Sequence, residues 1–203
     1  MTFLTPPRVL PLSIFGMLVS TPFAAPLLGQ DAQPAYAEEV RGLMANPAIA
    51  SALDLAEAHD DWALERLIEL TEIPAPPFME EERGVRFGEL LEELGADSVW
   101  TDAEGNVIGL RRGRTGTRTI GFGGHLDTVF PEGTDVSVRQ VGDTLFAPGV
   151  GDDTRGLVVV LSVLRALEEA GVETDDDVLF VGDRKSTRLN SSHSQQSRMP
   201  SSA

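Results

Sequence analysis

The chain has 203 residues, of which 41% are hydrophobic and 24% are charged, and this is typical of a globular protein with one sizeable core. Its formal net charge of −16 argues against nucleic acid or an anionic membrane as the partner. It contains no cysteine, which excludes disulfides, a thiol nucleophile and thiolate metal ligands, so any bound metal must be held by His, Asp or Glu.

The first 37 residues have the pattern of a secretory signal peptide. Arg8 precedes an apolar stretch from Val9 to Ser20, and the small residues Ala35 and Ala37 stand at the two positions that a signal peptidase inspects. Prolines interrupt the stretch and leave it shorter than the ~20 apolar residues of a membrane-spanning helix. We therefore expect residues 1–37 to be removed, and the mature protein to be exported to the periplasm or the medium with no membrane attachment.

Helical and extended patterns alternate along the middle of the chain. Asn46 is predicted to cap the first helix, and Gly95 to end the second. The predicted helices are 47–71, 79–95 and 154–170, and the predicted strands are 97–102, 106–113, 118–129, a hairpin within 135–149, and 176–183. Apolar strands that alternate with helices indicate an α/β fold, here a three-layer α/β/α domain with a mostly parallel sheet.

The composition changes abruptly after Asp183. Residues 184–203 contain no acidic residue, and they hold seven serines and Lys185, the only lysine of the chain. Such a segment is either a flexible polar tail or, as we favour, translated adapter or vector sequence joined to the reading frame. We therefore expect the folded domain to span residues 38–183, and we leave His193 out of the candidate site.

Candidate metal-binding residues stand where the predicted strand 118–129 ends. His125 and Asp127 are two residues apart, so on a strand their side chains project to the same side. Ligands bind at the carboxyl ends of strands in open α/β sheets, and a histidine that ligates a metal commonly has its ring held by a carboxylate. The pair therefore suits a ligand and the residue that orients it, although solvated strand ends carry such pairs too.

Two adjacent acids, Asp152 and Asp153, precede the predicted helix 154–170. An aspartate at a helix start can simply cap free backbone amides, and Asp153 or Thr154 can do only that. Asp152 stands one residue further out in a glycine-rich turn. There its carboxylate can bridge two cations about 3.5–4 Å apart, as two-metal hydrolases require.

Three motifs in order, GGHLDTVFP, GDTLFAPGVGDDTRGL and DVLFVGD, resemble the zinc peptidase and deacylase family that includes peptidase T, carboxypeptidase G and acetylornithine deacetylase. The likeness covers about residues 60–183, and its upstream part is most similar to peptidase T. The resemblance implies the N-terminal half of a two-zinc catalytic domain, with cobalt or manganese as alternative ions. His125 would ligate one zinc, Asp127 would be the catalytic residue that orients it, and Asp152 would bridge both ions. A cis peptide would join Asp152 to Asp153, a structural neighbour of the site.

The family's general base and a further zinc ligand form a Glu-Glu pair shortly after the strand that corresponds to 176–183. This chain has Asp-Arg-Lys-Ser-Thr there instead. The family's later acidic ligand, its C-terminal histidine ligand and its lid domain have no counterpart either. The resemblance therefore implies a truncated, inactive fragment.

The function implied by the resemblance is metal-dependent cleavage of amide bonds in small peptides, as by a peptidase T-like aminopeptidase or tripeptidase, with a homodimer as an expected assembly of the intact enzyme. One alternative is an N-acyl-amino-acid deacylase of the same family. Others are a truncated homologue that binds peptides or a protein partner, and an exported acidic binding module without catalysis. A calcium-binding module is disfavoured because no D-x-D-x-D-G spacing occurs.

Overall fold

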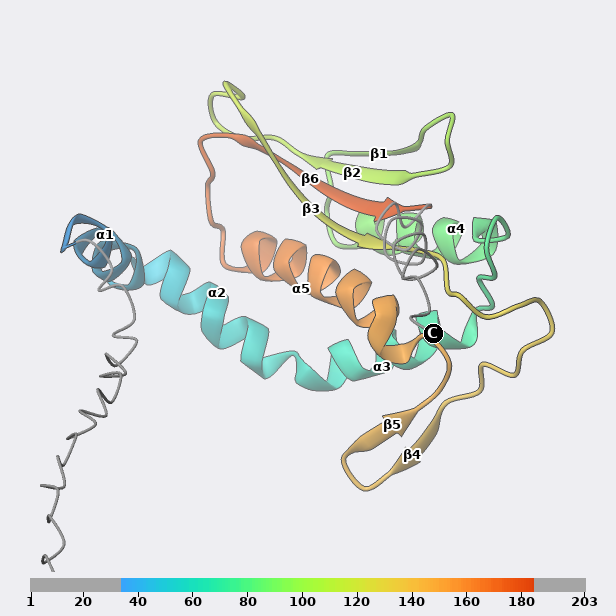
Figure 1. The fold of residues 1–203 in the computed structure, drawn as a ribbon. Helices are drawn as coiled ribbons and strands as arrows, with labels where there is room; N and C mark the ends of the chain where they lie inside the picture. The colour runs from blue at the N-terminus through green and yellow to red at the C-terminus, as the bar shows by residue number, and fades with distance from the viewer. Residues whose placement is uncertain (1–33, 185–203) are drawn as a thin grey trace, which may run out of the picture.

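The computed structural model describes residues 34–184, which form helices packed against a mixed β-sheet (Figure 1). The predicted tail therefore lies outside the described residues, except for Arg184, and so does most of the predicted signal peptide. Residues 35–37 belong to the first helix, α1 (Pro34–Met44), and cleavage beside them stays a prediction. Within residues 34–184 no helix is both long enough and apolar enough to cross a membrane.

The helices follow the predicted pattern with one interruption. They are α2 (Pro47–Ala58), α3 (Asp60–Glu72), α4 (Glu81–Glu93) and α5 (Arg155–Glu169). The predicted cap is confirmed, because the Asn46 side chain accepts a hydrogen bond from the amide of Ala48 at 2.9 Å. The single helix expected over 47–71 is instead divided at His59, and Asp60 and Asp61 begin the next helix. Acids in a first turn favour a helix start, which explains the division.

The main sheet has four strands in the order β1-β2-β6-β3. Its strands are β1 (Ser98–Thr101), β2 (Val107–Arg111), β3 (Thr119–His125) and β6 (Asp177–Asp183), while β4 (Arg139–Val141) and β5 (Thr144–Phe146) form a separate hairpin. The α/β class is confirmed, but the expectation of a mostly parallel sheet needs correction. Only β3 and β6 pair in parallel, while β1–β2 and β2–β6 are antiparallel.

The connections explain this mixture of pairings. A turn between Asp102 and Asn106 joins β1 to β2, and so short a link requires antiparallel strands. The chain from β3 to β6 instead crosses over through α5, which is the connection that parallel strands need. The parallel register runs from Thr119 opposite Asp177 to His125 opposite Asp183, so both strands end at the same edge.

Helices α4 and α5 cover one face of the sheet, and α2 and α3 lie beyond α5 (Figure 1). Alternate residues of β6, Val178, Phe180 and Gly182, point into this core, where Phe180 is fully buried. On the opposite face the β6 residues Leu179 and Val181 are only half-buried. The second helix layer of the expected three-layer arrangement is not found within residues 34–184.

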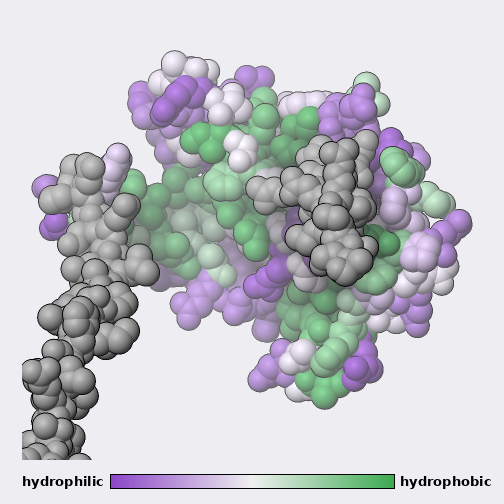
Figure 2. All heavy atoms as spheres, viewed as in Figure 1, coloured by the Kyte–Doolittle hydropathy of each residue, from purple (hydrophilic) through white to green (hydrophobic). Residues whose placement is uncertain are grey.

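Exposed hydrophobic side chains occur at several places on the described domain, and two of these places lie near the sheet edge and the hairpin. One lies beside the edge strand β3 and α5, where Ile120, Phe122 and Val159 are exposed, and the other lies on the β4–β5 hairpin, where Val141 and Phe146 are exposed (Figure 2). The hairpin leaves the domain after β3 and returns to it just before α5. This excursion brings the start of α5 back to the carboxyl end of β3, where the candidate site lies.

Candidate metal centre

The strand end carries the first two candidate residues. β3 ends at His125, which lies opposite Asp183 of β6 in the parallel register. The amide of Leu126 donates a hydrogen bond of 2.7 Å to the carbonyl of Asp183, so the two strands remain joined one residue beyond the ladder. Asp127 and the following Thr128 are buried. The site therefore lies at the carboxyl edge of the parallel pair, as the sequence predicts.

The imidazole of His125 is held from both sides. Its Nδ1 lies 3.0 Å from Oδ1 of Asp127 and 2.9 Å from the carbonyl of Asp127, and its Nε2 lies 2.9 Å from Oδ1 of Asp152. The hydrogen bond to Asp127, helped by Asp152 and opposed by burial, raises the pKa of His125 to about 9. In the metal-free chain the ring is therefore protonated at neutral pH, and a proton occupies the nitrogen that a metal would need.

The turn Val150–Thr154 (η1) brings the two adjacent acids to this strand end. The peptide between Asp152 and Asp153 is cis, which confirms the expectation from the resemblance. The carboxylate of Asp152 is 78% exposed and reaches His125 Nε2, whereas the Oδ2 atom of Asp153 accepts a hydrogen bond of 3.0 Å from the backbone amide of His125. Asp153 thus joins the start of α5 to the end of β3.

Glycines allow this close approach of the helix start to the strand. A Cβ atom on Gly124 would lie 2.9 Å from the amide nitrogen of Leu157 and 3.0 Å from Asp153 Oδ2. A Cβ atom on Gly156 would collide with the Asp153 carboxylate. The absence of side chains at these two positions is therefore required for Asp153 to reach the backbone of His125.

The donor types fit zinc, but their number is small. A ligating histidine usually has its other ring nitrogen held by a carboxylate, as Asp127 holds Nδ1 here, and Asp152 adds an oxygen donor next to Nε2. Catalytic zinc normally has about three protein ligands. Within residues 34–184 no group of three or more His, Asp and Glu side chains is placed to hold a metal ion. The described residues therefore offer His125 and Asp152 as two candidate donors, which is fewer than catalytic zinc normally has.

The structure adds two residues that the sequence analysis did not single out. Asp183 ends β6 beside His125, and an acid at the end of an apolar strand is the same signal that drew attention to Asp127. Arg83 is fully buried in α4 and donates a hydrogen bond to the carbonyl of Leu126. Its position four residues before Phe87, on the apolar side of a predicted helix, was the available signal.

The segment that carries these residues is similar in sequence to known proteins. Residues 121–183, which run from β3 to the end of β6, match the model of peptidase family M20/M25/M40. Carboxypeptidase G2 from Pseudomonas sp. (strain RS-16) is 36% identical over 69 residues, which are 33% of this chain and 16% of that protein. The segment 121–183 includes all five histidine and aspartate positions discussed above, His125, Asp127, Asp152, Asp153 and Asp183.

Solved structures share the fold at lower sequence identity. The aminopeptidase PepT of Bacillus cereus superposes with a TM-score of 0.52 at 22% identity, over 60% of this chain and 35% of that one. Human carnosine dipeptidase 1 gives a TM-score of 0.55 at 17% identity, over 66% of this chain and 34% of that one. The chain thus spans about a third of the length of these peptidases. Its resemblance to the zinc peptidase and deacylase family is confirmed: residues 121–183 match the model of the M20/M25/M40 peptidase family, and the chain shares an α/β fold with these peptidases.

Proposed function

We propose that this chain carries part of the active site of a metal-dependent hydrolase that cleaves amide bonds in small peptides. The observation that carries the proposal is the arrangement around His125. One ring nitrogen is held by Asp127, and the other faces Asp152 across 2.9 Å. Two ligands bound to one tetrahedral zinc lie about 3.3 Å apart, so a small outward movement of the exposed Asp152 side chain would accommodate an ion.

Each residue has a distinct part in this proposal. Asp127 would keep the proton on Nδ1 of His125, which would leave Nε2 free to hold an ion, and would raise the basicity of the ring. Asp152 would supply an oxygen ligand and neutralise part of the ion's charge. Asp153 takes no part as a ligand, because its carboxylate is bonded to the His125 amide. When bound, a divalent ion would act as a Lewis acid toward the carbonyl of the scissile amide.

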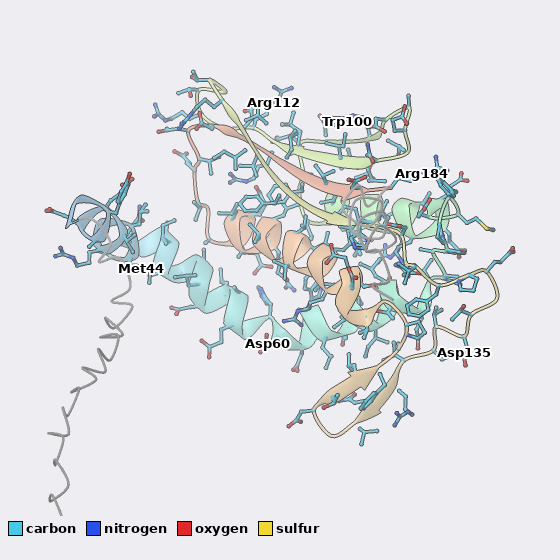
Figure 3. All side chains as sticks on the ribbon, in the orientation of Figure 1. Met44, Asp60, Trp100, Arg112, Asp135 and Arg184 are labelled. Atoms are coloured by element: carbon cyan, nitrogen blue, oxygen red, sulfur yellow. The ribbon has the colours of Figure 1, made fainter. Side chains whose placement is uncertain are left out.

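The small number of ligands limits what the 203-residue chain can do by itself. At the end of β6, where the resemblance implies a general base and a further ligand, stand Arg184 and Lys185. Arg184 forms an ion pair with the buried Glu80, and its side chain lies at the α4 end of the sheet (Figure 3). We infer that the chain binds zinc weakly and does not turn over peptides. Aminopeptidase or tripeptidase specificity, export and a homodimer follow from the resemblance and the N-terminal pattern, and they are part of the proposal.

Zinc binding tests the site directly. Titration of the metal-free chain with Zn²⁺, followed by NMR signals of the histidine rings, should perturb His125, and Zn²⁺ binding measured by calorimetry should be lost in His125→Gln and Asp152→Asn. His59→Gln is the matched control, because His59 is also paired with a carboxylate, that of Glu169, and its side chain is 19% exposed against 16% for His125. Zinc binding that persists in His125→Gln would contradict the proposed centre.

Peptide hydrolysis tests the inferred inactivity. The 203-residue chain, loaded with Zn²⁺, should not release amino acids from unblocked tripeptides faster than the Asp152→Asn variant does. Zinc-dependent turnover that is abolished by a chelator would show that two ligands suffice, and the inferred inactivity would be wrong. Turnover of N-acyl-amino acids but not of peptides would instead support the deacylase alternative.

A further inference from the structure

A fully buried arginine lies beneath the candidate metal centre. Arg83 stands in the first turn of α4, and its side chain is completely inaccessible to solvent. It lies on the same side of the helix as Phe87 and Leu90, both of which belong to the hydrophobic core. Burial of a guanidinium group at such a position costs free energy, because it removes the water that solvates the charge.

The hydrogen bonds of Arg83 end on backbone carbonyls of two separate segments. Its Nη1 donates to the carbonyl of Leu126 at 2.9 Å. Its Nε and Nη2 both donate to the carbonyl of Ile73, at 3.1 and 2.6 Å. The guanidinium therefore joins the segment after α3 to the residue that lies between His125 and Asp127.

Leu126 is consequently held on both of its backbone groups. Its amide donates to the carbonyl of Asp183 in β6, and its carbonyl accepts from Arg83 below. Its side chain is 1% exposed within the core. With both peptide groups restrained, the direction in which the chain leaves His125 is set, and with it the place where the Asp127 carboxylate meets His125 Nδ1.

The charge of Arg83 interacts with Asp127. Burial lowers the pKa of Arg83 to about 10, and the nearby negative charge of Asp127 opposes that decrease. The guanidinium remains protonated at neutral pH, so a positive charge lies near the carboxylate of Asp127. An apolar side chain of similar length would fill the same space at no desolvation cost, so packing alone does not account for an arginine here.

We propose that Arg83 is a positioning residue for the metal centre: by clamping the Leu126 carbonyl and facing Asp127, it holds Asp127 on Nδ1 of His125 and keeps Nε2 directed at the ion. The role of Nε2 as a metal ligand rests on the proposed function. The effect of Arg83 on the His125–Asp127 hydrogen bond is independent of the proposed function, and it can be measured without metal.

Two substitutions separate the charge of Arg83 from its forked geometry. Arg83→Lys retains a cation but cannot bond two carbonyls in the same plane, and Arg83→Met retains only the length of the side chain. Arg86→Met is the matched control. Arg86 lies three residues further along α4 and also links α4 to α3, through Glu69, but its other partners are the α4 residues Glu89 and Glu93.

The first readout is the ring ¹H–¹⁵N spectrum of His125 in the metal-free protein, with folding verified by circular dichroism. We expect an Nδ1 proton protected from exchange in the wild type and in Arg86→Met, and its loss through exchange broadening in folded Arg83→Lys and Arg83→Met. The second readout is the Zn²⁺ dissociation constant. It should rise about tenfold or more in Arg83→Lys, as is usual when a group that orients a ligand is removed, and less than about twofold in Arg86→Met.

The outcomes distinguish the two proposals. Loss of the protected proton in Arg83→Lys, in a protein whose wild type binds no zinc, would support positioning and refute the proposed function. An unchanged His125 ring spectrum in both folded Arg83 variants would overturn the positioning role. Unfolding of both Arg83 variants while Arg86→Met folds would overturn it too, because Arg83 would then support the whole domain rather than the site.

Discussion

The two sides of the candidate centre are held very differently. On the strand side, the side chains of His125 and Asp127 are 16% and 13% exposed, and the intervening Leu126 is bonded through both of its backbone groups. On the turn side, the carboxylate of Asp152 is 78% exposed and has His125 Nε2 as its hydrogen-bond partner among the described residues. We call the strand side the rigid side, because burial and backbone hydrogen bonds restrain it, and the turn side the adjustable side, because its carboxylate is exposed.

This difference in exposure and hydrogen bonding shows which contacts position each residue of the site. The position of His125 follows from the register of the sheet and from contacts beneath it, which bind the backbone. The position of Asp152 follows from its neighbour Asp153, whose carboxylate is bonded to the His125 amide. A metal ion can therefore recruit Asp152 by a side-chain rotation, without moving the strand or the helix start.

The largest expected effect is the loss of stability when a glycine on the strand side is replaced by alanine, compared with the same change at a glycine on the turn side. Gly124→Ala places a methyl group 2.9 Å from the backbone of α5, so strand and helix must separate, and the free energy of unfolding should fall by about 1–3 kcal/mol. Gly151→Ala, in the turn, meets no atom within 4 Å and should change stability by about 0.5 kcal/mol or less. Urea unfolding of both variants measures the contrast. Equal losses would mean that the turn is as tightly packed as the strand end.

Adding ligands to the rigid side should strengthen metal binding. Arg184 and Lys185 directly follow β6, the strand that ends beside His125. The double substitution Arg184→Glu with Lys185→Glu removes two positive charges and adds two carboxylates there. Isothermal titration should show a Zn²⁺ dissociation constant at least about tenfold lower than in the wild type, equivalent to about 1.4 kcal/mol. The double substitution Arg188→Glu with Arg198→Glu, further along the chain, controls for the same change in net charge, and an equal gain there would leave only a general electrostatic effect.

The pKa of His125 should depend more on the buried partner than on the exposed one. Asp127→Asn removes the largest contribution to the raised pKa, so the pKa of His125 should fall well below about 9. Asp152→Asn removes a smaller contribution from a solvated carboxylate and should lower that pKa less. An NMR titration of the His125 ring in each metal-free variant gives both values. A larger decrease of the His125 pKa in Asp152→Asn than in Asp127→Asn would reverse the assignment of the rigid and adjustable sides.

A final expected effect is on stability as a function of pH. The pKa of His125 is raised from 6.5 to about 9 on folding, so its stabilising contribution is complete below pH 6.5 and disappears as pH rises through about 9. The metal-free protein should therefore unfold at lower urea concentration at pH 9.5 than at pH 6. In His125→Gln this decrease should be smaller by the contribution of the ring. An identical pH dependence in both proteins would show that the ring is not ion-paired in solution.

Local features of the structure were accessible from the sequence. The helix 154–170, the cap at Asn46 and the shared direction of His125 and Asp127 all depend on residues within one or two turns or on the two-residue repeat of a strand. The proximity of His125 and Asp152 was expected from the family resemblance. That resemblance depends on the order and spacing of the motifs, and the M20/M25/M40 match confirms it. These features required no knowledge of how distant segments pack.

Only the tertiary structure decided the remaining features. Hydrophobic periodicity does not distinguish a parallel from an antiparallel neighbour, so the insertion of β6 between β2 and β3 was not predictable from it. The bond from Arg83 to Leu126 spans 43 residues, and the bond from Asp153 to the His125 amide spans 28. The spacing of Arg83 with Phe87 placed it on the apolar side of its helix, but the carbonyls that it bonds were not predictable from that spacing. The sequence determined which groups can act as ligands, because that depends on residue type and spacing, whereas the fold decided what holds them in place, because that depends on contacts between segments far apart in the chain.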